Sequence, residues 1–156
     1  MCTVGDDRNE TEDEKLDRKW GDLLQELRVM QTGAQLTAGF LLTLPFTTKF
    51  PSLDGFQQAL FLVLVLVAAL TTATVITPVA VHRKISGEHV KERLVLTAHR
   101  LVGVGLTLLA VLVTGIVVLI FDVVVDRTVA FVVGAVVAAI LATLLVALPL
   151  KLVGRG

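Results

Sequence analysis

The sequence is poor in the residues and spacings that usually mark chemistry. Cys2 is the only cysteine among 156 residues, so a disulfide within the chain and a cysteine-based metal cluster are both excluded. There is no P-loop, dinucleotide fingerprint, nucleophile elbow or zinc motif, and the lone Gly103-Val104-Gly105 is too short to count. We therefore expect no enzymatic activity and no cofactor.

Net charge is also absent, because 14 basic residues balance 14 acidic ones. No basic tract interleaved with aromatic residues is present, so we expect no nucleic-acid partner. The charges are unevenly spread, since the first 28 residues hold nine acids and five bases. This polar, acidic start does not resemble a secretory signal peptide.

What the chain has in excess is apolar sequence. Hydrophobic residues make up 54% and the mean hydropathy is +0.81, whereas soluble domains are usually about 45–50% apolar even with glycine counted. Long apolar runs predict membrane spans. We expect an all-α, four-helix transmembrane bundle occupying residues 29–156, with spans at about 29–46, 57–81, 101–125 and 128–150.

The polar extension before this bundle divides into two parts. Residues 1–10 are predicted to be disordered. Residues 11–28 predict an amphipathic cytoplasmic or interfacial helix, started by a capping box between Thr11 and Glu14. This helix either lies on the membrane surface with Trp20 at headgroup level or docks on the protein's own cytoplasmic loops.

The first span is unusually polar. At 100° per residue, one side of it carries Arg28, Gln31, Thr32, Gln35, Gly39 and Thr43. Lipid offers no hydrogen bonds, so this side should face other helices or water. Together with Glu26, these residues predict a polar intramembrane site for an ion, proton or small solute. The alternative is that Gln31 and Gln35 hold helices together while Arg28 reaches the lipid phosphates.

A second polar and small-residue stripe runs along the third span and contains His99, Gly103, Thr107, Ala110 and Thr114. His99 and Thr107 complete the candidate site. His82, His89 and His99 lack metal-ligand spacing, so we expect no metal there. The bases Arg83, Lys84, Lys91, Arg93 and Arg100 predict instead a solvated or lipid-facing loop, with either the acidic N-terminal helix or anionic lipid as its partner.

Two smaller features concern the fourth span. Asp122 and Asp126 either form a cation-binding mouth or act as a helix cap and a partner for Arg127. Gly134, Ala138 and Ala142 are spaced by four, which favours close helix packing.

The distribution of bases predicts the topology. Most of them lie in the N-terminal segment, the 82–100 loop and the tail, whereas the loops near Lys49 and Arg127 carry few. The positive-inside rule then places both termini in the cytoplasm, with the protein in the cell membrane as a multi-pass protein.

The first helix also carries a family resemblance. Leu24-Gln25-Glu26-Leu27-Arg28, Gln31-Thr32-Gly33, Gln35 and Leu41–Phe46 resemble a family of small bacterial membrane proteins classed as a domain of unknown function. Pro78–Arg83 and His99-Arg100-Leu101 are similar to its second and third spans. The resemblance implies four spans over about residues 16–150. Some members carry an automatic label of sodium:proton antiporter, a label with no known motif behind it.

The sequence is compatible with two functions. The first is a structural or interaction bundle that assembles with itself or with another membrane protein in the lipid bilayer. The alternative is a small oligomeric ion channel or cation/proton transporter with a polar path along the first and third spans. No carboxylate lies deep within a span, and proton coupling normally needs a buried titratable group, so the first is favoured.

Overall fold

A computed structural model describes residues 11–84, 91–147 and 150–151 of the chain. These residues are helical apart from short connections and contain no strand, which confirms the predicted all-α class. The elements are α1 (Glu12–Thr43), the 3₁₀ turns η1 (Leu44–Phe46) and η2 (Phe50–Ser52), α2 (Gly55–Lys84), α3 (Lys91–Val124), α4 (Arg127–Ala142) and the π-helical turn η3 (Thr143–Ala147).

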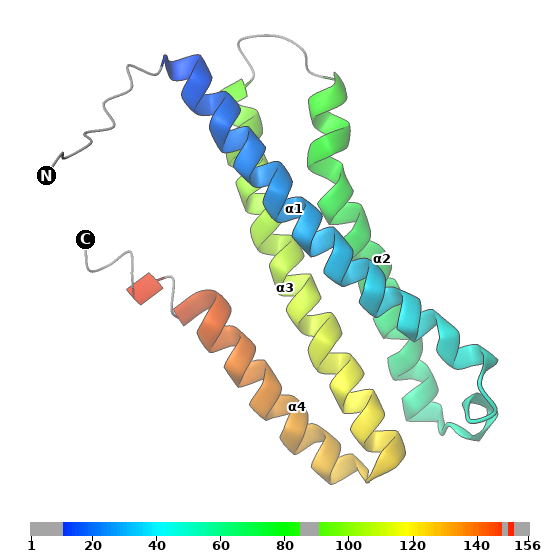
Figure 1. Cartoon of the computed structure of the whole chain (residues 1–156). Coiled ribbons are helices and arrows are strands. Elements are labelled where there is room, and N and C mark those ends of the chain that lie inside the picture. Colours follow the sequence, from blue (N-terminus) through cyan, green and yellow to red (C-terminus); the bar gives the residue numbers. More distant parts are fainter. Residues whose placement is uncertain (1–10, 85–90, 148–149, 152–156) are drawn as a thin grey trace, which may run out of the picture.

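The four long helices alternate in direction, so that α1 and α3 run one way and α2 and α4 the other (Figure 1). α3 is the central helix, because it packs against each of the other three. α1 crosses over α2 and α3, while α4 lies on the opposite side of α3 and diverges from it toward its C-terminal end (Figure 1).

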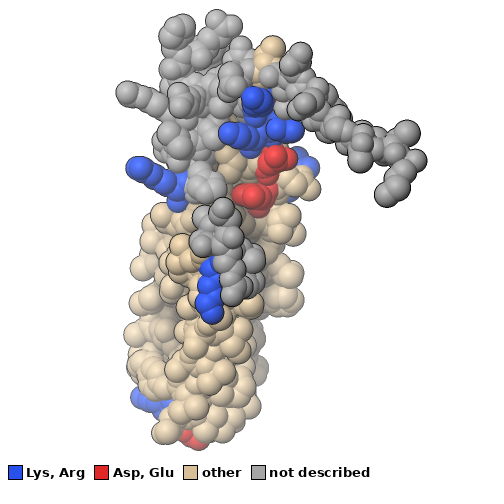
Figure 2. Space-filling view, turned by 90° about the vertical axis from the view of Figure 1, so that its left-hand side faces the viewer, with Lys and Arg blue, Asp and Glu red and all other residues tan. Residues whose placement is uncertain are grey.

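Three helices are long and apolar enough to cross a membrane, namely Gly55–Ala80, Arg100–Val124 and Arg127–Ala147. They cover the second, third and fourth predicted spans. Figure 2 shows most charged side chains near the upper end of one face and a few at its lower tip, with a mainly uncharged surface between them that a basic side chain interrupts. α1 is not among the three, because its glutamines and charged residues lower its hydropathy, and a fourth span at 29–46 stays a prediction.

α1 is one continuous helix of 32 residues. It begins at Thr11, whose hydroxyl accepts from the Glu14 backbone N–H while the Glu14 carboxylate accepts from the Thr11 N–H, which confirms the capping box. No break occurs at Arg28, so the boundary predicted between residues 11–28 and 29–46 lies inside a single helix.

α2 likewise continues without a break, although it contains a proline, a residue that usually kinks or ends a helix. Pro78 removes one backbone donor, yet the helix passes it and ends at Lys84. The Pro78 side chain is fully buried.

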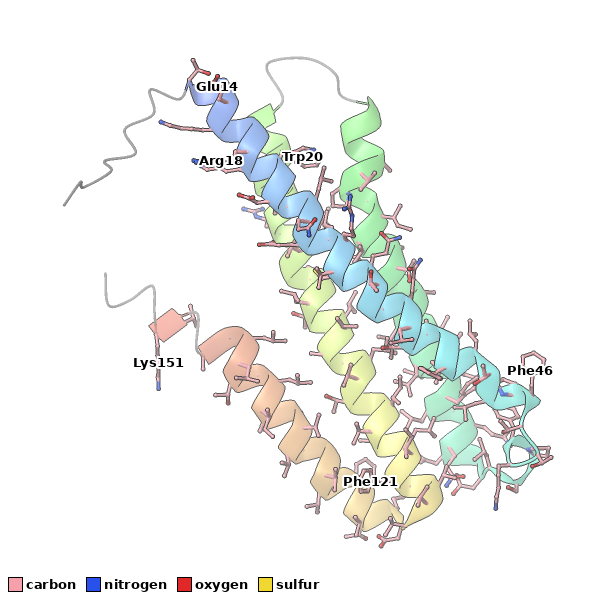
Figure 3. All side chains as sticks on the ribbon, viewed as in Figure 1. Glu14, Arg18, Trp20, Phe46, Phe121 and Lys151 are labelled. Atoms are coloured by element: carbon pink, nitrogen blue, oxygen red, sulfur yellow. The ribbon has the colours of Figure 1, made fainter. Side chains whose placement is uncertain are left out.

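Two apolar clusters hold α1 against the bundle. Near one end, Leu23, Leu27 and Met30 pack with Val75 and Val102, and Trp20 lies against this group. Figure 3 shows Trp20 on the side of α1 that faces the bundle. Near the other end, Leu41 packs in a second cluster with Phe61, Leu64, Ala68, Leu112 and Leu119. α1 is therefore in contact with the bundle from Leu23 to Leu41, alongside the apolar parts of α2 and α3.

Candidate functional site

The connections at the lower end of Figure 1 are built from two helix caps. Asp54 precedes α2, and its Oδ1 accepts from the Gln57 backbone N–H at 2.9 Å while the Gln57 side chain accepts from the Asp54 N–H at 3.0 Å. Asp126 precedes α4 and accepts from the backbone N–H groups of Thr128 and Val129. Both caps satisfy donors that have no partner within the helix.

Arg127, the first residue of α4, connects these caps to α3. Its Nε donates to Oδ1 of Asp122 at 3.1 Å, and its Nη2 donates to Oδ2 of Asp54 at 2.6 Å. The Asp122 side chain is only 2% exposed, whereas those of Arg127 and Asp54 are about half exposed. One guanidinium thus bridges the buried Asp122 carboxylate of α3 and the surface Asp54 carboxylate that precedes α2.

Two aromatic rings complete this group of residues. The Arg127 guanidinium carbon lies 4.3 Å from the centre of the Phe56 ring, and Phe56 in turn contacts Phe131 with 5.9 Å between ring centres. We call Asp54, Phe56, Asp122, Arg127 and Phe131 the end cluster. It joins the start of α2, the end of α3 and the start of α4.

The end cluster decides between the two interpretations of Asp122 and Asp126. Asp126 is a helix cap and Asp122 is the partner of Arg127, as the second interpretation predicted. Asp54 was not predicted as a member. Its capping pattern with Gln57 was visible in the sequence, but its contact with Arg127 spans 73 residues and no local pattern indicates it.

The acidity of Asp54 follows from these contacts. The backbone N–H of Gln57 is the largest influence and lowers the pKa of the Asp54 carboxyl, and Arg127 lowers that pKa further. Partial burial acts in the opposite direction but is outweighed. Asp54 therefore stays ionised at neutral pH and keeps both of its roles.

The predicted site on α1 lies on the outer side of the helix. Arg28, Thr32, Gln35, Gly39 and Thr43 are exposed and Gln31 is half-buried; we call these six residues the α1 polar face. Glu26 is exposed as well. The face is therefore turned away from the other described helices of the same chain. The sequence left open whether this side faces other helices or water, and the structure leaves water or another molecule.

The hydroxyls and amides of this face differ in their bonding. Thr32 donates to the Arg28 carbonyl and Thr43 to the Phe40 carbonyl, so both hydroxyls are satisfied within α1. The side-chain amides of Gln31 and Gln35 make no hydrogen bond to any described residue. Each side-chain amide offers two donors and an acceptor, so these two residues are the unsatisfied part of the face.

The stripe on α3 lies in a different place. Gly103, Thr107, Ala110 and Thr114 all line an open groove between α3 and α4, with a volume of about 1110 Å³. The Thr107 hydroxyl donates to the Gly103 carbonyl at 2.9 Å. No residue of the α1 polar face lines this groove, so Thr107 and Gln35 are not brought together.

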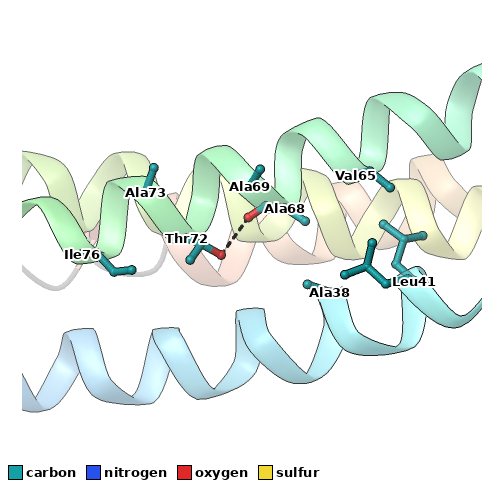
Figure 4. Close-up of a pocket in the computed structure, with 9 residues that line it drawn as sticks. Ala38, Leu41, Val65, Ala68, Ala69, Thr72, Ala73 and Ile76 are labelled. Carbon is teal, nitrogen blue, oxygen red and sulfur yellow. Dashed lines mark hydrogen bonds between the residues drawn. The ribbon is translucent and has the colours of Figure 1, made fainter.

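A second, smaller groove of about 450 Å³ separates α1 from α2 (Figure 4). Its lining is apolar apart from Thr72, whose hydroxyl donates to the Ala68 carbonyl. Here Ala38 and Leu41 of α1 stand opposite Val65 and Ala68 of α2, and Ile76 lies further along α2 (Figure 4). The groove offers no free polar group to a ligand.

Several predicted residues lie outside what the structure describes. Residues 1–10 and His89 are outside the described ranges, as are the side chains of His82, Arg83, Lys84, Lys91, Arg93 and His99. Among the described residues, no group of three or more histidine, cysteine, aspartate or glutamate side chains is arranged to hold a metal ion.

A family model described as a family of unknown function, DUF6328, matches residues 9–149. The chain belongs to this family. The match covers the four helices and the end cluster, and it agrees with the resemblance seen in the α1 sequence. No curated protein and no solved structure matches the chain. Membership in the family therefore carries no assigned activity.

Proposed function

We propose that this chain is a non-enzymatic, multi-pass protein of the cell membrane, with both termini cytoplasmic, that assembles with a second copy through the α1 polar face. The observation that carries the proposal is the position of Gln35. This side chain is exposed and makes no hydrogen bond to a described residue, although it sits on a helix that runs beside two apolar spans.

The depth of Gln35 follows from its neighbours along α1. Met30 packs near Val75 and Val102, close to one end of the apolar parts of α2 and α3, and Leu41 packs near Phe61 and Leu64, close to the other. Gln35 lies between these contacts. When α2 and α3 cross a bilayer, Gln35 lies within the hydrocarbon layer, where an unpaired amide is costly.

A second copy of α1 supplies what this amide lacks. A glutamine side chain both donates and accepts, so the same residue from two copies can pair across a two-fold axis. Gly39 lies on the same face, and a Cβ built on it meets no atom within 4 Å, which leaves room for a close approach of two helices. Leu36 and Phe40, both exposed beside the face, add apolar contact area.

The channel or transporter alternative has less support. Its path was expected along both stripes, whereas no residue of the α1 polar face lines the groove that contains Thr107. The hydroxyls of Thr32, Thr43 and Thr107 already donate to backbone carbonyls. Neither stripe alone offers a continuous row of free polar groups.

Cross-linking in proteoliposomes tests the assembly. With Cys2 replaced by serine, we expect Gly39→Cys to give a disulfide-linked dimer on mild oxidation. Val136→Cys is the matched control, because Val136 is exposed on α4, away from α1. Gln35→Leu in the Gly39→Cys background should reduce the linked fraction, since an interhelical polar contact contributes about 1 kcal/mol, or about fivefold in affinity. Equal linking at positions 39 and 136, or none at 39, contradicts the proposal.

A further inference from the structure

The groove between α3 and α4 has one charged residue in its lining. Arg100 lies at one end of it, and the remaining lining residues are apolar, glycine or threonine. Arg100 is exposed and forms no ion pair with a described residue. We propose that this groove binds an anionic phospholipid, with the phosphate on Arg100 and an acyl chain along the groove.

The position of Arg100 suits a headgroup. It is the first residue of the apolar stretch Arg100–Val124 and so lies where the hydrocarbon layer begins. From Arg100 to Gly115, the lined part of α3 extends about 22 Å at 1.5 Å per residue. One leaflet contributes about 15 Å of hydrocarbon, so the groove accommodates an acyl chain that enters from the Arg100 side.

The walls of the groove explain why it stays open. α4 packs closely on α3 at its start, where Ala130 and Gly134 are buried. One and two turns further along the same face, Ala138 and Ala142 line the groove instead. Small side chains on α4 face small side chains on α3, such as Gly103 and Ala110, so neither wall fills the space between the diverging helices.

The charge in the lining favours a lipid over a helix. A helix from a second copy leaves Arg100 without a counterion unless it brings a carboxylate to the same level. A phospholipid brings an anionic group and an apolar chain in one molecule.

Native mass spectrometry of the full-length protein tests this proposal, with phosphatidylglycerol and phosphatidylcholine of equal acyl chains as probes. We expect the wild type to bind phosphatidylglycerol more tightly than phosphatidylcholine. Arg100→Gln should weaken phosphatidylglycerol binding about fivefold, as expected for one basic residue near the membrane surface, and leave phosphatidylcholine binding unchanged.

A second variant tests the groove itself. A Cβ on Gly103 meets no atom within 4 Å, so Gly103→Leu adds a side chain to the groove without a clash at its Cβ and should weaken binding of both lipids. Lys19→Gln and Gly21→Leu are the matched controls, because both residues are exposed on α1 and Gly21 also has open space at its Cβ position.

Three results overturn the lipid proposal: no preference for phosphatidylglycerol in the wild type, unchanged binding by Arg100→Gln, or unchanged binding by Gly103→Leu. A loss of dimer in Gly103→Leu with lipid binding intact assigns the groove to a second copy instead. The test is independent of the assembly through α1, because Gln35→Leu should change the dimer fraction without changing lipid binding.

Discussion

Gly134 on α4 packs so tightly on Val118 of α3 that a methyl group at Gly134 would overlap the Val118 side chain. A similar contact joins Gly115 of α3 to Leu64 of α2. The two contacts differ in how easily the overlapping side chain can move aside. The overlapping atom on Leu64 is at the end of a flexible side chain, whereas valine is stiff at χ1. The contact between Gly134 and Val118 is therefore the less tolerant of added volume.

This contact predicts that Gly134→Ala destabilises the protein. We expect overpacking to cost about 1–3 kcal/mol, and the better helix propensity of alanine recovers at most about 1 kcal/mol of it. Thermal or denaturant unfolding in a mild detergent measures the change. Gly33→Ala is the matched control, because a Cβ at Gly33 meets no atom within 4 Å, and this substitution should be neutral or stabilising.

Val118→Ala supplies the second half of this test. In the double variant the shortened side chain makes room for the new methyl group, so Gly134→Ala should cost less than it does alone. Equal costs of Gly134→Ala in the two backgrounds would show that the contact with Val118 does not limit the approach of α4 to α3.

The end cluster predicts a pH dependence with a defined sign. The folded-state pKa of Asp54 is lowered, first by the Gln57 backbone N–H and then by Arg127. Asp54 therefore contributes stability that is fully present above its unfolded pKa of about 3.9 and is lost as pH falls through the lower folded pKa. We expect the unfolding temperature to fall with acidification below about pH 4.

Asp54→Asn isolates the contribution of this carboxylate. Asparagine still caps a helix but cannot ionise, so the variant should show a shallower loss of unfolding temperature at acid pH. Glu14, whose pKa is lowered mainly by its hydrogen bond from the Thr11 backbone, titrates in the same direction, so Glu14→Gln is the control that removes its share. A pH profile unchanged by Asp54→Asn is incompatible with the ionised Asp54 described above.

Ion flux distinguishes the assembling bundle from the channel or transporter. We expect the purified, folded protein in liposomes to pass no sodium, potassium or protons above the level of empty vesicles. The reason is that the two polar stripes do not line a common groove. Selective flux that Gln35→Leu abolishes would instead show that α1 lines a path, formed where several copies meet.

The features that could be predicted from the sequence are local ones. The caps at Thr11 and Asp126 were evident because a capping residue and its partners lie within a few positions of each other. The pairing of Asp122 with Arg127 was within reach for the same reason, since the two are five residues apart. Hydropathy was sufficient to predict the three apolar helices, because the apolar character of a span is summed over all of its residues.

What the sequence could not supply is which faces meet. The period of α1 placed Gln31, Gln35 and Gly39 on one side, but it does not say whether that side points toward α2 and α3 or away from them. The register of the contacts at Met30 and Leu41 settles this, and it depends on side chains from other helices. The joining of Asp54 to Arg127 was hidden for the same reason.

The unequal lengths of the helices have a consequence for partners in solution. α4 with its π-helical turn, from Arg127 to Ala147, is about 31 Å long, close to the thickness of a hydrocarbon core. α1 and α3 are both longer, and each extends past the apolar level at the end where Thr11 and Lys91 lie. At the opposite end, two residues join α3 to α4, and eleven residues that include two short 3₁₀ turns join α1 to α2. In a bilayer, short helical ends would therefore project from the membrane on one side, and the other side would be almost level with the membrane surface. A soluble protein would make nearly all of its contacts with the projecting helical ends.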